Sequence, residues 1–242
     1  MRSPLSNKRV LLVGVGGLGS PAALVLAHAG VGTIAIADDD TVDVTNLHRQ
    51  ILFDDTHVGT NKVLAAEEGL RRWVPGAYEV VVHQTRILPT NARALVSGYD
   101  VVVEGSDNFA TKFMVADACV LEHVPVVHGS AVRWHGTALA VGARGQPCYR
   151  CLFEDIPHEH APSCAEAGVV GPVVGIVAAL QADLAVAMMR GEDVTGTLVT
   201  FDGKTSVHRR RAIAQRASCD LCSLGRIDSI ELSRYVPDAC HD

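Results

Sequence analysis

The fold is decided by the stretch RVLLVGVGGLGSPAALVLAHAG, residues 9–30. It opens with a short apolar run, continues with glycines in the pattern GxGxxG, and ends in a segment rich in helix-forming Ala and Leu. A second apolar run follows at 33–37 and leads directly into Asp38. This order of strand, tight turn, helix and strand is typical of a parallel sheet with a right-handed crossover.

The same alternation continues along the first half of the chain. From the apolar patterns we expect helices at 61–72, 91–97 and 109–122, and strands at 78–84, 100–104 and 125–128. From residue 136 the pattern changes to a period of two, at 137–141 and 197–213, which predicts antiparallel strands. The predicted fold is therefore α/β, a Rossmann-like, mostly parallel sheet with helices on both faces, extended by antiparallel strands.

The overall charge excludes some classes of function. The formal net charge is −6 and the isoelectric point is near 6.0, so no basic field would attract nucleic acid or an anionic membrane. The run 208–211, His-Arg-Arg-Arg, is the local exception. It predicts either a solvated strand face or a docking patch for an acidic protein, and we favour the solvated face.

Neither apolar segment of note predicts a membrane location. The run after Arg9 is interrupted by glycines, unlike a secretion signal. The segment 169–189 is apolar enough to span a bilayer, but Gln181 and Asp183 lie in its middle, where lipid would penalise them. We therefore expect a cytoplasmic protein in which this segment is a buried helix at the interface of a homodimer.

The glycine turn predicts a nucleotide site. Bare glycine backbone at Gly14, Gly16, Gly17 and Gly19 lets phosphates approach the start of a helix, whose N-terminus favours negative charge. Asp38 ends the next strand, where a carboxylate binds a ribose hydroxyl. The alternative is a turn that only packs tightly, with Asp38 capping the residues after it. NAD and ATP both present a ribose and phosphates, so this pattern alone does not separate them.

The residues after Asp38 favour ATP. The stretch DDDTVDVTNLHRQ, residues 38–50, places carboxylates such as Asp40 beside Asn46 and Arg49, a mixture suited to phosphates and Mg²⁺. Lys62 begins a predicted helix, and Asp107 and Asn108 follow a predicted buried strand at its carboxyl end, where ligands bind in open α/β sheets. Each could instead be a surface ion-pair partner. Together they predict a nucleotidyl-transfer site.

The chain resembles the sulfur-carrier adenylyltransferases, the ThiF, MoeB and HesA group related to ubiquitin-activating enzymes. The resemblance runs from about residue 8 to residue 222 and includes GVGGLGS, ADDDTVDVTNLHRQILF, GSDN, PCYRC, AGVVGPVVG and FDGK. It is closer to the thiamin-pathway branch than to the molybdopterin branch, and an activator for a specialised sulfur-containing metabolite is a further alternative.

The resemblance implies a reaction and the roles of individual residues. The terminal glycine carboxylate of a small ubiquitin-like sulfur carrier, ending in Gly-Gly, would attack the α-phosphate of ATP and release pyrophosphate. Gly17 and Asp38 would contact adenosine, and Asp107, next to Asn108, would hold Mg²⁺. The implied phosphate ligands are Asn46, Arg49 and Lys62. No rhodanese-like extension is present, so we expect a sulfur donor acting in trans.

The resemblance also implies an N-terminal arm. Family members carry an arginine near the motif RYxRQ that reaches into the nucleotide site of the partner subunit, and MRSPLSNK does not match it. We expect that Arg2 substitutes, that turnover is slow, or that a segment precedes this start.

Four of the seven cysteines predict a metal site. Cys148 and Cys151 form one CxxC pair, and Cys219 and Cys222 form another. Tetrahedral Zn²⁺ favours four sulfurs, and the two-residue gap lets both thiolates of a pair face one ion, so we predict a structural zinc site. A redox pair is the alternative for either CxxC taken alone.

The other cysteines and two histidines have separate interpretations. The predicted loop 153–168 contains Cys164. The residues support structural packing and sulfur transfer equally for this cysteine. In the thiamin branch that the chain resembles, a cysteine at this place can bond covalently to the carrier. Cys119 is expected in the core. His158 and His160 are expected to be exposed, and Cys240 lies in a tail outside the resemblance.

These motifs divide the chain, which at 242 residues we expect to form one domain. Its predicted parts are a nucleotide-binding half at 8–135, an antiparallel extension with the zinc site at 136–222, and a C-terminal tail at 223–242.

Two rival functions are an NAD-dependent oxidoreductase and a non-catalytic scaffold. The first gives Arg49, Lys62, Asp107 and the cysteines no role, and the second is disfavoured by the presence of Asp107.

Overall fold

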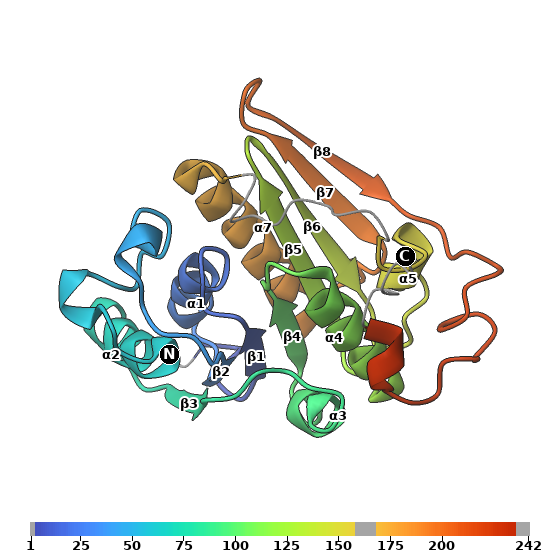
Figure 1. The fold of residues 1–242 in the computed structure, drawn as a ribbon, viewed down its shortest axis with the longest axis horizontal. Helices are drawn as coiled ribbons and strands as arrows, with labels where there is room; N and C mark the ends of the chain where they lie inside the picture. Colours follow the sequence, from blue (N-terminus) through green and yellow to red (C-terminus); the bar gives the residue numbers. More distant parts are fainter. Residues whose placement is uncertain (1–2, 158–167, 236–242) are drawn as a thin grey trace, which may run out of the picture.

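The computed structural model describes residues 3–157 and 168–235, and they form an eight-stranded sheet with helices on both faces (Figure 1). The strand order is β3-β2-β1-β4-β5-β6-β7-β8. The strands are β1 (Arg9–Val13), β2 (Thr33–Ala37), β3 (Glu79–His83), β4 (Val101–Glu104), β5 (Val126–Val132), β6 (His135–Val141), β7 (Thr197–Asp202) and β8 (Val207–Ala212). The pairs from β3 to β5 are parallel and those from β5 to β8 are antiparallel.

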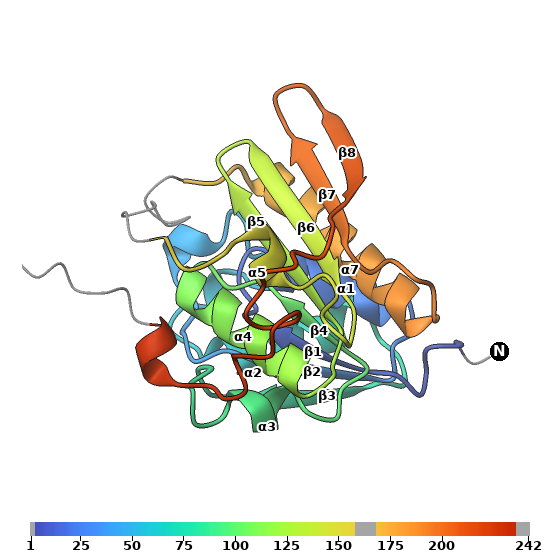
Figure 2. The same cartoon turned by 90° about the vertical axis from the view of Figure 1, so that its right-hand side faces the viewer.

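Helices cover both faces of the sheet (Figure 2). One hydrophobic cluster gathers α1 (Gly19–His28), α2 (Lys62–Trp73) and α7 (Gly171–Met189). The other gathers α3 (Ala92–Val96), α4 (Phe109–Leu121) and α5 (Tyr149–Leu152). Strand β1 is buried on both sides because Val10 and Leu12 enter the first cluster while Leu11 and Val13 enter the second. The predicted fold class is thus confirmed.

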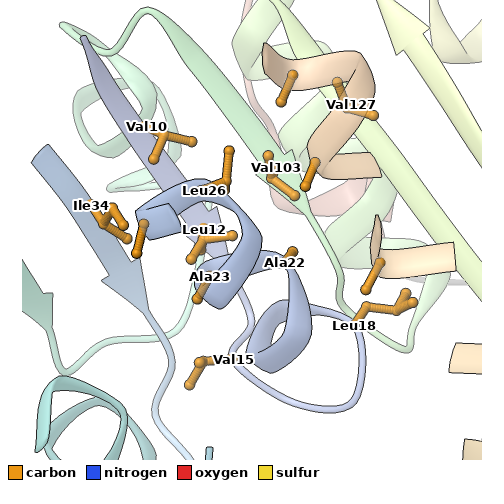
Figure 3. Close-up of a cluster of buried hydrophobic side chains, with 14 of the residues drawn as sticks. Val10, Leu12, Val15, Leu18, Ala22, Ala23, Leu26, Ile34, Val103 and Val127 are labelled. Atoms are coloured by element: carbon orange, nitrogen blue, oxygen red, sulfur yellow. The ribbon is translucent and has the colours of Figure 1, made fainter. Parts of the chain in front are cut away.

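The helix after the glycine turn is held by apolar packing against the sheet. Leu26 and Ala23 of α1 lie over Leu12 and Ile34, as Figure 3 shows. All four are fully buried. Burial of a Leu or Ile side chain contributes roughly 1.5 to 3 kcal/mol, so this contact holds α1 against β1 and β2.

The second half of the chain differs from the prediction in three places. Strand β5 runs on to Val132 instead of ending at His128, because β6 pairs with its whole length. The segment 197–213 is not one strand but the hairpin β7–β8, turned at residues 203–206, where Asp202 Oδ1 accepts a hydrogen bond from the Lys204 N–H. The short helix α5 was not predicted.

Helix α7 is the one described helix long and apolar enough to cross a membrane, but more than half of that apolar segment is buried inside the fold. It packs against β4, β5, β6 and α1. One large apolar side chain of α7, Ile176, is exposed on the surface. The intramolecular core therefore accounts for most of the apolar character that suggested a subunit interface, and the homodimer stays a prediction.

One polar side chain enters this apolar core. Gln181 of α7 is fully buried, and its amide donates to the carbonyl oxygens of Glu104 (2.9 Å) and Val127 (3.2 Å). Strand β5 has Gly129 opposite it, where an added Cβ would lie 2.1 Å from the Gln181 carboxamide. The helix, β4 and β5 are thus joined by an amide that only a glycine can accommodate.

We expect Gly129→Ala to lower the free energy of unfolding by about 2 to 4 kcal/mol, because it displaces the Gln181 amide from both hydrogen bonds. The control is Gly175→Ala in α7, where an added Cβ meets nothing within 4 Å. That change should stabilise the helix by up to about 1 kcal/mol. Urea denaturation measures both, and equal effects would contradict this account of Gln181.

Candidate active site

The turn between β1 and α1 is built from close backbone approaches. Gly14 has φ +83°, a left-handed conformation that favours glycine. A Cβ on Gly19 would lie 2.0 Å from the Gly14 carbonyl oxygen, and one on Gly17 would lie 3.0 Å from Val174. Ser20 Oγ donates to the Val15 carbonyl (2.8 Å) and ties the turn to the helix.

Asp38 holds this turn from the end of β2. Its carboxylate accepts hydrogen bonds from the Val15 N–H and the Asp40 N–H, both at 2.9 Å. Burial raises the pKa of Asp38, and these two hydrogen bonds oppose the rise. The capping role considered from the sequence is therefore present. It leaves acceptor lone pairs on both oxygens for a ribose hydroxyl, so the two roles are compatible.

Two cations predicted to bind phosphate line the same cleft as the glycine turn. Arg49 Nη2 donates to Asn46 Oδ1 (2.6 Å), and Asn46 ends the single-turn 3₁₀ helix η1 (Val44–Asn46). Lys62 is the first residue of α2 and is 6% exposed, with its Nζ 2.7 Å from Asp40 Oδ2. Lys62 thus lies in the cleft, and it also forms an ion pair with Asp40, whose side chain is exposed.

The opposite side of the cleft is the turn after β4. Asp107 and Asn108 are exposed there, and Asn108 Oδ1 caps α4 by accepting from the Thr111 N–H (2.8 Å). Within the described residues, Asp107 belongs to no cluster of three or more potential metal ligands. Mg²⁺ bound by Asp107 would therefore take its remaining ligands from phosphate oxygens and water, the usual arrangement for Mg²⁺ on a nucleotide.

These residues converge on one cleft of about 280 Å³. The predicted nucleotide-site residues that line it are Gly14, Gly16, Gly17, Asp38, Asp40, Asn46, Arg49, Lys62, Asp107 and Asn108. Gly19 does not line the cleft, and its role is the tight contact with Gly14. The cleft lies at the carboxyl ends of β1, β2 and β4, the position expected for a ligand in a sheet of this order.

Other residues of the cleft were not singled out from the sequence. Gln50 is buried, with no hydrogen-bond partner for its Oε1 among the described residues, and Arg86 is 3.4 Å from Asp39 at the rim. Gln50 stands in the motif that contains Arg49, so proximity in sequence could have found it. Arg86 follows β3 in a stretch without a motif, and only the parallel pairing of β3 with β2 brings it to the cleft.

A buried ionic cluster lies beneath the Asp107 turn. Glu104 is fully buried and contacts Lys112 Nζ (2.9 Å) and His128 Nδ1 (3.1 Å), while accepting hydrogen bonds from the Ser106 N–H (2.7 Å) and the Ser106 hydroxyl. Lys112 Nζ also donates to the Gly129 carbonyl (2.6 Å). Burial raises the pKa of Glu104, but Lys112, His128 and Ser106 outweigh it and lower the pKa to about 2. The cluster joins the turn to α4 and β5.

The four cysteines of the two CxxC pairs come together as predicted. Their sulfurs all lie within 4.8 Å of one another, with Cys148–Cys219 at 3.5 Å, Cys151–Cys222 at 3.4 Å and Cys148–Cys151 at 3.9 Å. A tetrahedral centre with Zn–S bonds of about 2.3 Å places its sulfurs about 3.8 Å apart, so the set fits zinc. Burial, followed by the neighbouring thiols, raises the pKa of Cys148.

An ion pair links the cysteine cluster to the helix that begins at the nucleotide cleft. Arg150, between Cys148 and Cys151, donates to both carboxylate oxygens of Asp117 in α4 (2.8 and 2.9 Å). Tyr235 donates its hydroxyl to the same carboxylate (2.8 Å). Cys119, on the same helix, is fully buried in the core as predicted.

Several predicted residues lie outside the described part of the chain. They are Arg2, His158, His160, Cys164 and Cys240.

Comparison with known proteins agrees with this architecture. Residues 2–223 match the ThiF family. The chain belongs to the ThiF family. Adenylyltransferase and sulfurtransferase MOCS3 of Anopheles gambiae is 40% identical over 223 residues, which cover 90% of this chain and 50% of that protein. The SAMP-activating enzyme E1 of Haloferax volcanii is 38% identical over 235 residues, covering 96% of this chain and 86% of that protein.

A solved structure of another protein has the same fold as this ThiF-family chain. The E. coli protein MccB, crystallised with ATP, superposes with a TM-score of 0.78 over 90% of this chain and 68% of MccB, at 21% identity. At that identity the likeness establishes the fold alone. The chain spans about half the length of the MOCS3 relatives that it matches.

The buried cluster should be visible in the pH dependence of stability. The pKa of Glu104 is lowered from 4.5 to about 2, so its stabilisation is present above about pH 4.5 and is lost as the pH falls toward 2. We expect Glu104→Gln to cost about 3 kcal/mol at pH 7, with a smaller difference from wild type at pH 3. Denaturant unfolding across this range measures it.

The control for this prediction is Glu67→Gln, which breaks the exposed helical pair with Arg71. It should cost no more than about 0.5 kcal/mol. A cost for Glu104→Gln that is the same at pH 7 and pH 3 would show that the carboxylate charge does not stabilise the fold.

Proposed function

We propose that this chain transfers AMP from MgATP to the C-terminal carboxylate of a small ubiquitin-like sulfur-carrier protein. The observation that carries the proposal is the convergence of Arg49, Lys62 and Asp107 on one cleft with the glycine turn and Asp38. A dinucleotide oxidoreductase needs the turn and Asp38 but has no use for two cations and a carboxylate at the phosphate end. The names of the MOCS3 and SAMP-activating relatives support an activating adenylyltransferase.

The residues of the cleft divide the reaction between them. Asp38 orients the ribose, and the Gly14–Gly19 turn lets the α-phosphate approach the helix N-terminus. Arg49 and Lys62 offset the charge that grows on the phosphates as the carrier carboxylate attacks and pyrophosphate leaves. Mg²⁺, held by Asp107, would neutralise part of the phosphate charge. The product is an acyl adenylate, ready for a sulfur donor acting in trans.

The cleft also distinguishes an enzyme from a scaffold. Asp107 is exposed in the cleft, where a nucleotide-bound Mg²⁺ can reach it. A scaffold would not need this carboxylate. The thiamin branch, the homodimer, the cytoplasmic location and a role of Cys164 in sulfur transfer stay predictions.

We further propose that the four cysteines bind one structural Zn²⁺. The sulfur spacing fits a tetrahedral ion, and the cluster joins segments that are far apart in sequence. Two of the four cysteines, Cys148 and Cys219, are buried, and four thiolates this close together need a cation to offset their mutual repulsion. A redox role would require one CxxC pair to act without the other, whereas the four sulfurs lie together in one cluster.

We expect Asp107→Ala to lower carrier-dependent exchange between pyrophosphate and ATP by at least about a hundredfold, because a group that stabilises the transition state is lost. The thermal unfolding curve should stay unchanged, since Asp107 is exposed. Asp183→Ala, the same change on the exposed side of α7, is the control and should keep full exchange. Turnover with NAD and none with ATP would refute the proposal.

For the metal, elemental analysis of freshly purified protein should give about one zinc per chain, and none for Cys148→Ser. The variant should lose unfolding free energy on the order of several kcal/mol because metal binding contributes to folding. Cys119→Ser is the matched control, since Cys119 is a buried thiol outside the cluster and its loss should leave the zinc content intact. Wild-type protein that is folded without zinc would contradict a structural metal.

A further inference from the structure

Asp107 lies on a turn that is fastened on both sides. Its own side chain is exposed, and among the described residues its carboxylate has no hydrogen-bond or ion-pair partner. Ser106, the residue before it, donates its N–H (2.7 Å) and its hydroxyl to Glu104 Oε1. Asn108, the residue after it, accepts from the Thr111 N–H and so caps α4. The contacts of its two neighbours therefore determine where the Asp107 carboxylate stands.

The acceptor for Ser106 is a carboxylate that is used completely. Glu104 is the last residue of β4 and is fully buried. Its Oε1 accepts both hydrogen bonds from Ser106, while its Oε2 lies 2.9 Å from Lys112 Nζ and 3.1 Å from His128 Nδ1. A carboxylate has about four lone-pair sites, so each of them has a partner here. Turning the carboxylate would break several of these contacts at once, so Ser106 is bonded to a fixed acceptor.

Lys112 and His128 tie this carboxylate to the elements beside the turn. Lys112 belongs to the first turn of α4, because its N–H donates to the Asn108 carbonyl (3.2 Å). Its Nζ also donates to the Gly129 carbonyl of β5 (2.6 Å), and His128 precedes Gly129 on that strand. The acceptor that holds the turn is thus itself held by β4, α4 and β5 together.

A buried ion pair is a costly way to fill this space. Apolar side chains of similar volume are often as stable or more stable, because the attraction between two buried ions barely offsets the hydration that they lose. Apolar side chains would, however, leave the N–H and the hydroxyl of Ser106 without an acceptor. What Glu104 supplies, and an apolar residue cannot, is therefore a fixed acceptor for the turn that carries Asp107.

We propose that Glu104 is a positioning residue, which through Ser106 holds Asp107 where it can bind the Mg²⁺ of MgATP. Lys112 balances the charge of Glu104 and ties it to α4. This inference rests on the proposed function. Neither Glu104 nor Lys112 lines the nucleotide cleft, whereas Ser106 and Asp107 do, so the effect on the nucleotide is indirect. A metal ligand must be held within about 0.5 Å of its working position, and hydrogen bonds behind the ligand provide this.

Two other roles for the cluster make different predictions. In the first, the cluster only stabilises the fold, and any buried ion pair of α4 would serve as well. In the second, Lys112 binds a phosphate directly. Lys112 lines a second cavity of about 400 Å³ that shares Asp107 and Asn108 with the nucleotide cleft, and two of its three Nζ–H donors are used. Direct binding would strengthen the affinity for ATP with or without Mg²⁺, whereas positioning acts only when Mg²⁺ is present.

The test separates the Mg²⁺-dependent part of ATP affinity from the rest. Calorimetry gives the Kd of ATP in magnesium chloride and in EDTA, with no acyl substrate present, and the ratio of the two Kd values is the Mg²⁺ effect. We expect an effect of at least about tenfold in wild type, and of about one in Asp107→Ala. The double variant Glu104→Leu, Lys112→Met removes both ions and the acceptor, so it should also bring the effect close to one. Its Kd in EDTA should stay as in wild type.

Two further variants isolate the hydrogen bonds to Ser106. Glu104→Gln, Lys112→Met also removes both charges, but the amide oxygen of glutamine can accept from Ser106, so the Mg²⁺ effect should return to that of wild type. Ser106→Ala loses the hydroxyl donor and keeps the N–H, so it should lower the effect about threefold. Ser106 is only partly buried, so this variant tests the proposal even if the core variants do not fold.

Asp117→Asn is the matched control, because it breaks another buried ion pair of α4, the one with Arg150. It should lower the urea midpoint of unfolding and leave the Mg²⁺ effect unchanged. An equal loss of the effect in Asp117→Asn would show that the cluster serves stability alone. Weaker ATP binding in EDTA in the variants without Lys112 would show that Lys112 binds phosphate directly. Either result would overturn the positioning role.

The variants also separate this inference from the proposed function. If the Mg²⁺ effect of wild type survives in Asp107→Ala, Asp107 is not the metal ligand and the proposed function fails at this step. If Asp107→Ala abolishes the effect but the Glu104→Leu, Lys112→Met variant keeps it, the proposed function stands and the positioning role is rejected.

Discussion

The structure depends on one backbone contact, in which the start of α1 touches the end of β1. The Gly19 Cα approaches the Gly14 carbonyl so closely that no side chain fits between them. This contact points the helix N-terminus at the cleft and places Gly14 against Gly105 at the end of β4. The Asp107 turn and the glycine turn therefore lie on opposite sides of the cleft, where the main chains of Gly14 and Gly105 come close together. Asp38 completes the arrangement by binding the Val15 N–H.

The sequence could predict what local patterns encode. Strands β1 and β2 have the predicted bounds because glycine and Asp38 mark their ends, and the cysteine pairs could be joined because zinc has only a few ligand patterns. The extent of β5 could not be predicted, since its last residues are held by pairing with β6 rather than by their own propensity. The single turn α5 is too short to show helical periodicity.

The buried ion pairs could not be predicted from sequence patterns for another reason. Glu104, Lys112 and His128 come from three different elements, and each would be taken for a surface residue if considered alone. Arg150 and Asp117 are likewise far apart in the chain. These pairs connect the cysteine cluster, α4 and the Asp107 turn, so the cysteine cluster and the nucleotide cleft are joined through α4. Buried ion pairs, together with apolar packing, therefore hold α4 in position.

Helix α7 has a consequence for the order in which the protein forms. It is synthesised after all the parallel strands, yet it covers β4, β5 and β6 and packs on α1. Until residue 189 has left the ribosome, one face of the nascent sheet therefore keeps apolar side chains such as Val103 and Val127 open to water. A fragment ending before Gly171 would contain every nucleotide-binding motif but would expose this face, and it would aggregate. The residues that make the cleft and the residues that make it foldable thus belong to different stretches of the gene.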